Sequence, residues 1–186
     1  MLKRVYKKLL RLYKVKILHK TVSSIKIEEW RKNGIVIGEG CIFCSELPIG
    51  RDSCLLEFGN NVLVSSNVTF LMHDAAPTTV SNGMGTDILG KVKIGDTSFI
   101  GAHSIIMPGV SLANNTVVGS GSVVTHSINK PGYVIAGNPA KVICSVEDYL
   151  KKNKDKIVNL NGMSSDDIKT FFESHPEKLI SKSNLL

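Results

Sequence analysis

One histidine stands where the chain could use it as a general base. His73 opens HDAAPTTVSNGMGTD, a polar stretch rich in Pro, Gly, Thr and Asn that covers residues 73–87. It follows Phe70 by three residues, at a corner where an imidazole ring can face a groove. Imidazole is well suited to take a proton from a hydroxyl group near neutral pH. His73 is therefore a candidate general base, with a solvated loop histidine as the alternative, and the loop after it suits a hydroxylated acceptor.

A histidine base needs a group that orients its second ring nitrogen. Asp74 is adjacent in sequence, and Glu57 and Asp87 could approach His73 through folding. Adjacent side chains diverge on a strand, so Asp74 could instead meet the acceptor. The sequence leaves these alternatives open. The predicted acceptor contacts are Asp74, Asp87 and Asn67. Asn67 lies one hexapeptide before His73, and an internal ladder or a turn role is the alternative for it.

Three histidines also raise the alternative of a zinc site like that of the γ-type carbonic anhydrases. His73, His103 and His126 are 30 and 23 residues apart and include no closely spaced pair. Cys41 and Cys44 form one CxxC pair, without the second pair that metal sites need. We therefore expect no metal and ordinary reduced cysteines, which favours a cytoplasmic protein.

A six-residue repeat supplies the elements that must position these groups. Aliphatic residues recur at Ile88, Ile94, Ile100, Ile106, Leu112, Val118 and Val124. Each is followed four positions later by Val92, Ser98, Ser104, Val110, Thr116, Ser122 or Ile128. The second residue of one pair and the first of the next are two apart, which places both on one face of a strand. Glycine, Pro-Gly and Asn-Asn between them suit corners, so the pattern predicts a stacked prism of parallel strands.

The repeat is less regular before the loop. It runs through Ile37, Phe43, Ile49 and Leu55, and then through Phe58, Val64 and Phe70. A three-residue slip separates the two series, and we expect a bulge or corner change near Glu57 to absorb it. The repeat disappears in the loop, resumes at Ile88, and ends in AGNPAKVI, residues 136–143.

These patterns divide the chain into three segments. We predict a basic N-terminal helical arm (1–33), a β-helix domain (34–145) with the ejected loop 73–87, and a C-terminal helical extension (146–186). Helices are expected at 146–158 and 164–180, the second opened by a Ser164/Asp167 capping pair. Their expected role is to cap the prism, and His19 and His175 are expected to be surface residues.

The positive charge belongs to the arm. The chain has a formal net charge of +7, but eight basic residues and no acid precede Thr21, which leaves 15 basic against 16 acidic residues in the remainder. The body is therefore not a basic surface for nucleic acid. The arm lacks the apolar run of a signal peptide or membrane span. We expect it to cover the open end of the prism or to pack on another subunit; docking of residues 1–20 on the inner face of an anionic membrane is the alternative.

The hexapeptides, the loop after His73 and the segments IGAHSIIMPGV, VGSGSVVTHSI and AGNPAKVI together resemble the hexapeptide-repeat acyltransferases. The pattern is nearest to the maltose, galactoside and polysaccharide O-acetyltransferases, over residues 34–143. The resemblance implies an all-β, left-handed parallel β-helix, a homotrimer with active sites between subunits, and direct acetyl transfer from acetyl-CoA to a sugar or glycan hydroxyl. Antibiotic acetylation and sugar N-acetylation are alternatives. A non-catalytic scaffold is a third alternative. The small-residue corners and the intact loop argue against it.

The resemblance favours His73 as the general base over a solvated loop histidine. It also implies residues that bind the coenzyme. The amide of Ala102 is expected to stabilise the oxyanion formed from the thioester. Gly101 leaves room for the pantetheine arm, and Ser120 and Thr125 match positions whose backbone holds the coenzyme. Lys141 matches a cation for the coenzyme phosphates.

Two histidines complete the predicted coenzyme groove. His126 stands where the family usually has lysine, and this departure puts one phosphate contact in doubt. If the loop is a single corner insertion, His103 stacks one coil beyond His73. Some sugar acetyltransferases have histidine at the position of His103, so a role in the coenzyme groove and that of a plain corner residue are both open.

Overall fold

The structure is a computed structural model that describes residues 22–181 of the chain. It divides into two compact units, Met1–Val146 and Glu147–Leu186. The first unit contains the repeat and the second contains the C-terminal helices.

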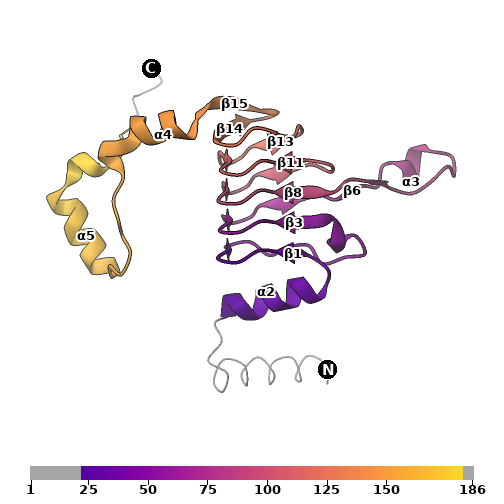
Figure 1. Cartoon of the computed structure of the whole chain (residues 1–186), viewed down its shortest axis with the longest axis horizontal. Helices are drawn as coiled ribbons and strands as arrows, with labels where there is room; N and C mark the ends of the chain where they lie inside the picture. Colours follow the sequence, from indigo (N-terminus) through magenta and orange to yellow (C-terminus); the bar gives the residue numbers. More distant parts are fainter. Residues whose placement is uncertain (1–21, 182–186) are drawn as a thin grey trace. The chain divides into compact units, whose positions relative to one another are not determined.

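Short strands form a rod of three parallel sheets in the first unit (Figure 1). Sheet A contains β1 (Val36–Ile37), β3 (Leu56–Phe58), β8 (Val92–Ile94) and β11 (Ser111–Leu112). Sheet B contains β2 (Ile42–Phe43), β4 (Leu63–Val64), β9 (Phe99–Ile100), β12 (Val117–Val118), β14 (Tyr133–Gly137) and β15 (Ala140–Ser145). Sheet C contains β5 (Thr69–Phe70), β10 (Ile105–Ile106) and β13 (Val123–Val124).

Each coil of the rod visits sheets A, B and C in turn, and the next coil stacks on it. Ile105 pairs with Val123 and Phe99 with Val117, so that stacked residues are 18 positions, or three hexapeptides, apart. This arrangement is typical of the left-handed parallel β-helix of hexapeptide-repeat proteins. The predicted fold class is confirmed.

The residues predicted to point inward form the core of the rod. Ile100, Ile106 and Val118 are fully buried, as are Ser104 and Ser122. A hydroxyl is tolerated there because the coils leave backbone carbonyls within its reach. The hydroxyls of Ser104 and Ser122 both donate to the carbonyl of Gly119, at 3.1 and 2.5 Å. Small polar residues thus fill the narrow interior, and no buried side-chain nitrogen or oxygen of residues 22–181 lacks a hydrogen-bond partner.

An aromatic stack and a helix close the N-terminal end of the rod. The rings of Trp30, Phe43, Phe58 and Phe70 pack edge to face in succession, with centroids 5.2, 5.1 and 5.1 Å apart. Trp30 belongs to α2 (Val22–Lys32) and is only 4% exposed. This packing buries apolar rings that the first coil would otherwise expose.

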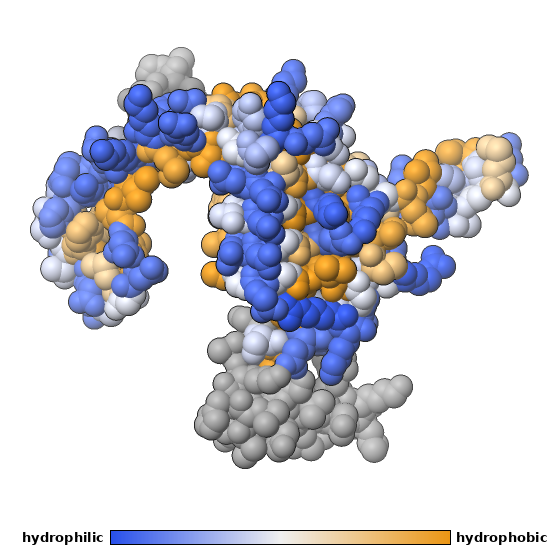
Figure 2. Space-filling model, in the orientation of Figure 1, coloured by the Kyte–Doolittle hydropathy of each residue, from blue (hydrophilic) through white to orange (hydrophobic). Residues whose placement is uncertain are grey.

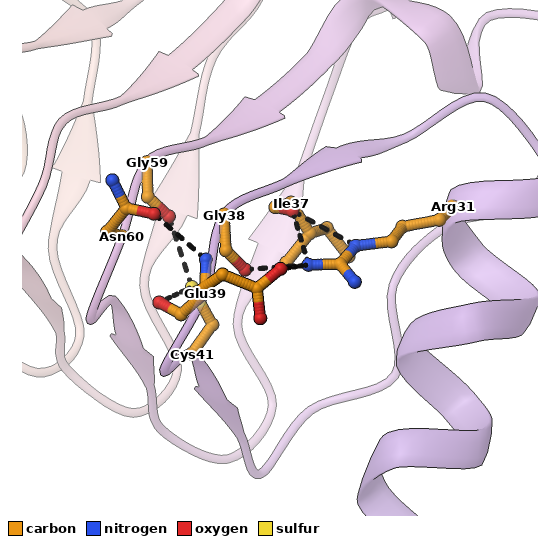
Figure 3. A network of polar contacts seen from close by, with 7 residues as sticks. All are labelled: Arg31, Ile37, Gly38, Glu39, Cys41, Gly59 and Asn60. Carbon is orange, nitrogen blue, oxygen red and sulfur yellow. Dashed lines mark hydrogen bonds and ion pairs between the residues drawn. The ribbon is translucent and has the colours of Figure 1, made fainter.

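Polar contacts fix α2 on the first coil (Figure 3). The guanidinium of Arg31 donates to the carbonyls of Ile37 and Gly38, and forms an ion pair with Glu39 at 2.9 Å. Residues 22–32 therefore cover this end of the rod. The basic arm of residues 1–20, with His19, lies outside the described residues, and its docking stays a prediction.

The expected inward position of Ile88 is wrong. Ile88 is 59% exposed and belongs to β7 (Ile88–Leu89), which pairs antiparallel with β6 (His73–Asp74). The two strands and α3 (Pro77–Val80) form a projection that leaves the rod (Figure 1). We call this projection the arm and the N-terminal segment the basic arm. The ejected loop therefore extends to Leu89, and the inward pattern resumes at Val92, which is fully buried.

The slip also lies elsewhere than expected. Ile49 is 51% exposed, while Leu47 is 5% exposed and packs in the core. The chain leaves the coil after β2 and returns through a short 3-10 helix, η1 (Ser53–Leu55). Glu57 lies in the regular strand β3. The extra residues thus form a loop before β3 rather than a bulge at Glu57.

The last repeat and the C-terminal unit differ in detail from the expectation. AGNPAKVI forms an antiparallel hairpin of β14 and β15 rather than a further coil.

The C-terminal helices are α4 (Val146–Asn153) and α5 (Ser165–Ser174), followed by η2 (Lys154–Lys156) and η3 (Pro176–Lys178) respectively, so both are shorter than predicted. The Ser164/Asp167 capping box is present, and His175 is exposed. Capping of the rod by these helices stays a prediction. Among residues 22–181, no helix has the length and apolar character needed to span a membrane.

Candidate active site

His73 lies at the corner where the chain leaves sheet C for the arm, beside a cavity of about 620 Å³. The cavity is lined by Gly50, Arg51, Asp52, Cys54, Leu55, His73, Asp87 and Leu89. These residues come from the loop before β3 and from the two bases of the arm. The loop before β3 and the arm, which are the two interruptions of the repeat, therefore meet at this cavity.

Asp52 is the partner of His73. Oδ2 of Asp52 lies 2.5 Å from Nδ1 of His73, and the two side chains are 15% and 48% exposed. The hydrogen bond to Asp52, together with its charge, raises the pKa of His73 above the ordinary 6.5, and the same hydrogen bond lowers the pKa of Asp52. A carboxylate at Nδ1 keeps the proton on that nitrogen and leaves Nε2 free to accept one.

None of the three carboxylates expected beside His73 orients it. Glu57 points from sheet A to two lysines, with Oε1 and Oε2 at 2.5 Å from Lys91 and 3.5 Å from Lys93. Those cations account for the lowered pKa of Glu57. Glu57 does not reach His73 because it lies in the regular strand β3, where its carboxylate is paired with these lysines.

The two aspartates of the arm have other partners. The carboxylate of Asp74 accepts a hydrogen bond from the backbone amide of Ala76 at 2.9 Å. Asp87 accepts one from the hydroxyl of Thr86 at 2.5 Å. Asp87 nevertheless lines the cavity, and its charge adds to the rise in the pKa of His73. Its predicted contact with the acceptor stays a prediction, as does that of Asp74.

The sequence contains only a partial signal for Asp52. In the first coil Val36 pairs with Glu57, and Ile42 with Leu63, so that stacked positions are 21 residues apart instead of 18. Asp52 and His73 are also 21 residues apart. This spacing equals one lengthened coil, but Asp52 lies in the loop that contains the three extra residues, where the register of the strands does not fix its position.

A second corner, between sheets B and C, contains Asn67 and His103. Both have left-handed backbone conformations, with φ of 56° and 59°. Nε2 of His103 lies 3.5 Å from Nδ2 of Asn67, and the amide of His103 donates to the carbonyl of Ser66. His103 thus stacks on Asn67, and the expected stacking on His73 is wrong. The reason is that β10 pairs with β5, with Ile105 opposite Thr69. The corner before β10 therefore stacks on the corner before β5, and the arm begins only after β5.

Ala102 and Ser120 lie at the same corner in successive coils. The carbonyl of Ala102 accepts from the amide of Gly121 at 2.8 Å, whereas the amide of Ala102 has no acceptor within residues 22–181. That N–H is available for an oxyanion. A Cβ on Gly101 would lie 2.5 Å from the amide nitrogen of Ser120, so the close approach of the coils requires glycine there.

The other predicted coenzyme residues are divided between two places. Thr125 and His126 follow β13 at the corner between sheets C and A, and the Thr125 hydroxyl lies 2.8 Å from Nδ1 of His126. Lys141 is exposed in β15, opposite Ala136 of β14. The structure therefore brings Gly101, Ala102, His103 and Ser120 to one corner, and His126 with Thr125 to the corner of His73.

His73 and Ala102 lie at opposite ends of one side of the rod. His73 follows β5, Ala102 precedes β10, and these two strands are stacked neighbours in sheet C. A side of this length spans roughly 15 to 20 Å, at about 3.3 Å per strand residue. One chain therefore cannot apply both groups to the same reacting atoms.

The cavity also contains a thiol that sequence reasoning left aside. Cys54 is a free, exposed cysteine that lines the cavity with His73. Cys54 reaches this place because the loop before β3 folds toward the arm. Among residues 22–181, no three His, Cys, Asp or Glu side chains are arranged to hold a metal ion.

Comparison with known proteins agrees with this architecture. Residues 84–126 match the family "Bacterial transferase hexapeptide (six repeats)". Protein CapG of Staphylococcus aureus is 38% identical over 153 residues, which cover 79% of this chain and 87% of CapG. The chain belongs to the hexapeptide-repeat acetyltransferase family. The predicted family and the predicted enzyme class, an acetyltransferase, are thereby confirmed.

Two further members of the family extend the comparison. The galactoside O-acetyltransferase of Escherichia coli K12 is 36% identical over 99 residues, which cover 52% of this chain and 47% of that protein. The crystal structure of a maltose O-acetyltransferase from Clostridium difficile 630 is similar with a TM-score of 0.56 and 27% identity, covering 75% of this chain and 83% of that one. The chain thus spans less than half the length of the galactoside enzyme.

Proposed function

We propose that this acetyltransferase moves an acetyl group from acetyl-CoA to a hydroxyl of a sugar or glycan precursor, with His73 as general base. The observation that carries the proposal is the Asp52–His73 pair at a cavity of about 620 Å³. A cavity of this size is in the range of small-molecule sites. Similarity to galactoside and maltose O-acetyltransferases supports the hydroxylated acceptor.

The proposed reaction is a direct transfer. Nε2 of His73 takes the proton of the acceptor hydroxyl while its oxygen attacks the thioester carbonyl. The amide of Ala102 donates to the oxyanion of the tetrahedral intermediate. The intermediate then expels the coenzyme thiolate, which receives the proton from the His73 imidazolium, and the acetyl ester is released. The carboxylate of Asp52 stabilises the imidazolium in between.

The separation of His73 and Ala102 supports an active site shared between copies of the chain. We propose that the Ala102 corner of one copy faces the His73 corner of another, in the homotrimer that the family resemblance implies. Along sheet B, the outward positions Ile42, Leu63, Phe99 and Val117 form an apolar row, with Ile42 57% and Phe99 37% exposed. Such a row favours a subunit contact.

The arm offers a further apolar surface for such a contact. Val80 and Met84 are 75% and 90% exposed, and Ile88 and Leu89 are 59% and 63% exposed. Figure 2 shows this surface in orange on the arm that projects from the rod. Apolar groups at this exposure favour burial against another chain.

The remaining predicted residues belong to the coenzyme groove. We propose that Gly101, His103 and Ser120 border the pantetheine arm, while Lys141 binds coenzyme phosphates. Thr125 and His126 lie at the corner of His73, so we propose that they reach the coenzyme from another copy of the chain, Thr125 at the adenine end and His126 at a phosphate. The four cysteines are free, which is typical of a reducing compartment and supports a cytoplasmic location.

A screen of acetyl transfer tests the proposal. Purified protein is incubated with acetyl-CoA and with nucleotide sugars, oligosaccharides and chloramphenicol, and products are located by mass and NMR. Transfer to a sugar hydroxyl is the expected result. Transfer to an amine alone, or to chloramphenicol alone, would overturn the assignment in favour of N-acetylation or xenobiotic acetylation.

The role of Cys54 is tested in the same assay. If the transfer is direct, Cys54→Ser retains activity, and no acetylated protein accumulates when acetyl-CoA is added without acceptor. Accumulation of an acetyl group on Cys54 in intact-mass spectra would replace direct transfer by an acyl-enzyme route.

A further inference from the structure

We propose that the acceptor carries an anionic group, a carboxylate or a phosphate, and that Arg51 binds it. The inference rests on the proposed function, because it names the class of acceptor that the His73 cavity takes. It starts from Arg51, a cavity residue to which the reaction scheme above gives no role.

The backbone around Arg51 is held next to the catalytic pair. Ser53 is only 1% exposed, and its hydroxyl accepts from the amide of Gly50 at 2.7 Å and donates to the carbonyl of Gly50 at 2.9 Å. This closed turn contains Arg51 and Asp52. Because Asp52 is fixed to His73, the neighbouring Arg51 is anchored at the same wall of the cavity.

The guanidinium of Arg51 has no carboxylate partner within residues 22–181. Asp52 is engaged with His73, and Asp87, the other acid of the cavity, accepts from the Thr86 hydroxyl. The hydrogen bond between Asp52 and His73 dominates the raised pKa of His73 and the lowered pKa of Asp52; the charge of Arg51 opposes the first shift and adds to the second. The cavity therefore has one cation whose hydrogen-bonding capacity is unused.

An unpaired guanidinium in a substrate cavity fits an oxyanion. Its planar array of N–H donors matches a carboxylate or phosphate, to which it can form two parallel hydrogen bonds. Asp87 repels such a group, so the anion belongs at the Arg51 wall and the neutral hydroxyls belong near Asp87. An acidic sugar, a sugar phosphate or a nucleotide sugar satisfies this arrangement, whereas a neutral sugar leaves Arg51 without a partner.

Matched acceptors test the inference. Initial rates are compared for glucose and glucuronic acid, and for N-acetylglucosamine, its 1-phosphate and its uridine diphosphate derivative. Arg51→Gln is expected to lower kcat/KM for the preferred anionic acceptor roughly 10- to 100-fold, the size of a lost charge-assisted hydrogen bond. Rates on the neutral partner and the KM for acetyl-CoA are expected to be unchanged. The pair that shows the effect distinguishes a carboxylate from a phosphate.

Lys93→Gln is the matched control, because it removes one positive charge outside the cavity, where Lys93 pairs with Glu57. It should leave the preference for the anionic acceptor intact. Equal losses on anionic and neutral acceptors in Arg51→Gln, or a rise confined to the KM for acetyl-CoA, would overturn the inference, the second by assigning Arg51 to a coenzyme phosphate.

Calorimetry with uridine diphosphate and with glucuronate separates this inference from the proposed function. Weaker binding of either anion to Arg51→Gln than to the unaltered protein supports the anion site, even if the screen finds no acetylated hydroxyl. Unchanged binding of both anions refutes the site, even if neutral sugars are acetylated.

Discussion

The two ends of sheet C show how one repeat produces two different kinds of site. At the corner between sheets B and C, the coils follow one another without interruption, and Asn67 and His103 adopt the same left-handed conformation in successive coils. At the corner between sheets C and A, the loop before β3 and the arm interrupt the coils and enclose a cavity with His73 and Asp52.

The difference assigns the two corners to different tasks. An uninterrupted corner presents backbone groups at regular spacing, and so it suits a long, extended ligand such as the proposed coenzyme. An interrupted corner can place charged side chains in one cavity and suits the base and the acceptor. Since the corners lie at opposite ends of a strand, chemistry that needs both favours a second copy of the chain.

Removal of the base at the interrupted corner should have the largest effect. His73→Ala is expected to lower kcat by roughly 10²- to 10⁴-fold, the range for loss of a general base. Coenzyme binding should persist, because the residues proposed to border the pantetheine arm, Gly101, His103 and Ser120, are unchanged. Steady-state kinetics and calorimetry with coenzyme A measure both. Full activity of this variant would remove His73 from the mechanism.

The uninterrupted corner can be tested by deleting one N–H. Ala102→Pro is expected to lower kcat by roughly 10²- to 10³-fold through loss of the oxyanion donor. Proline suits this position because the next residue, His103, has positive φ, as Gly109 has after Pro108 at another corner. Ser66→Pro, at the same turn position one coil earlier, is the control for folding. An active Ala102→Pro protein would place the oxyanion donor elsewhere.

Mixing the two variants tests whether the corners of different copies meet. Unfolding and refolding of His73→Ala with Ala102→Pro should restore activity to roughly one quarter of the unaltered protein, because about one site in four then combines two intact corners from different copies. Each variant refolded alone is the control. If the mixture stays as inactive as the separate variants, both groups act from the same chain.

Asp52→Asn should change both the pH profile and the maximal rate, and the shift of the pH profile is the more specific sign of the Asp52–His73 pair. The raised pKa of His73 keeps the ring protonated, and inactive as a base, to a higher pH than an ordinary histidine. Asp52→Asn should therefore move the acidic limb of kcat/KM to lower pH and lower the maximal rate about 10- to 100-fold through loss of the orienting carboxylate. Asp74→Asn is the control, because the Asp74 carboxylate lies in the arm and accepts a hydrogen bond from Ala76 instead of His73. If the acidic limb does not move in Asp52→Asn, the carboxylate does not set the pKa of the general base.

The smallest effect is expected at the proposed coenzyme phosphates. Lys141→Ala should raise the KM for acetyl-CoA about three- to tenfold with little change in kcat, as for loss of an exposed charge that binds the ground state. Lys130→Ala, another exposed cation near the C-terminal end of the repeat, is the control. An unchanged KM in Lys141→Ala would move the phosphate contacts to another part of the groove.

The regular part of the fold could be predicted because every hexapeptide repeats the same local physics. Ser98 and Val118 are buried as their spacing from Ile94 and Ile100 indicated, since successive strand residues alternate between faces. Errors arose only where the repeat stops. Ile88 fits the six-residue register but extends an arm, because spacing alone does not show where an inserted segment rejoins the coil.

The sequence by itself determined the family, the rod and the histidine that opens the arm, because these depend on local periodicity and on a residue type at a corner. Tertiary structure alone decided that Asp52, rather than Glu57, Asp74 or Asp87, meets His73, and that His103 stacks on Asn67. It also brought Arg51 and Cys54 into the cavity and separated Ala102 from the base. Each of these contacts depends on how many residues one coil contains, and a three-residue slip or an arm changes that number without changing the local pattern on either side.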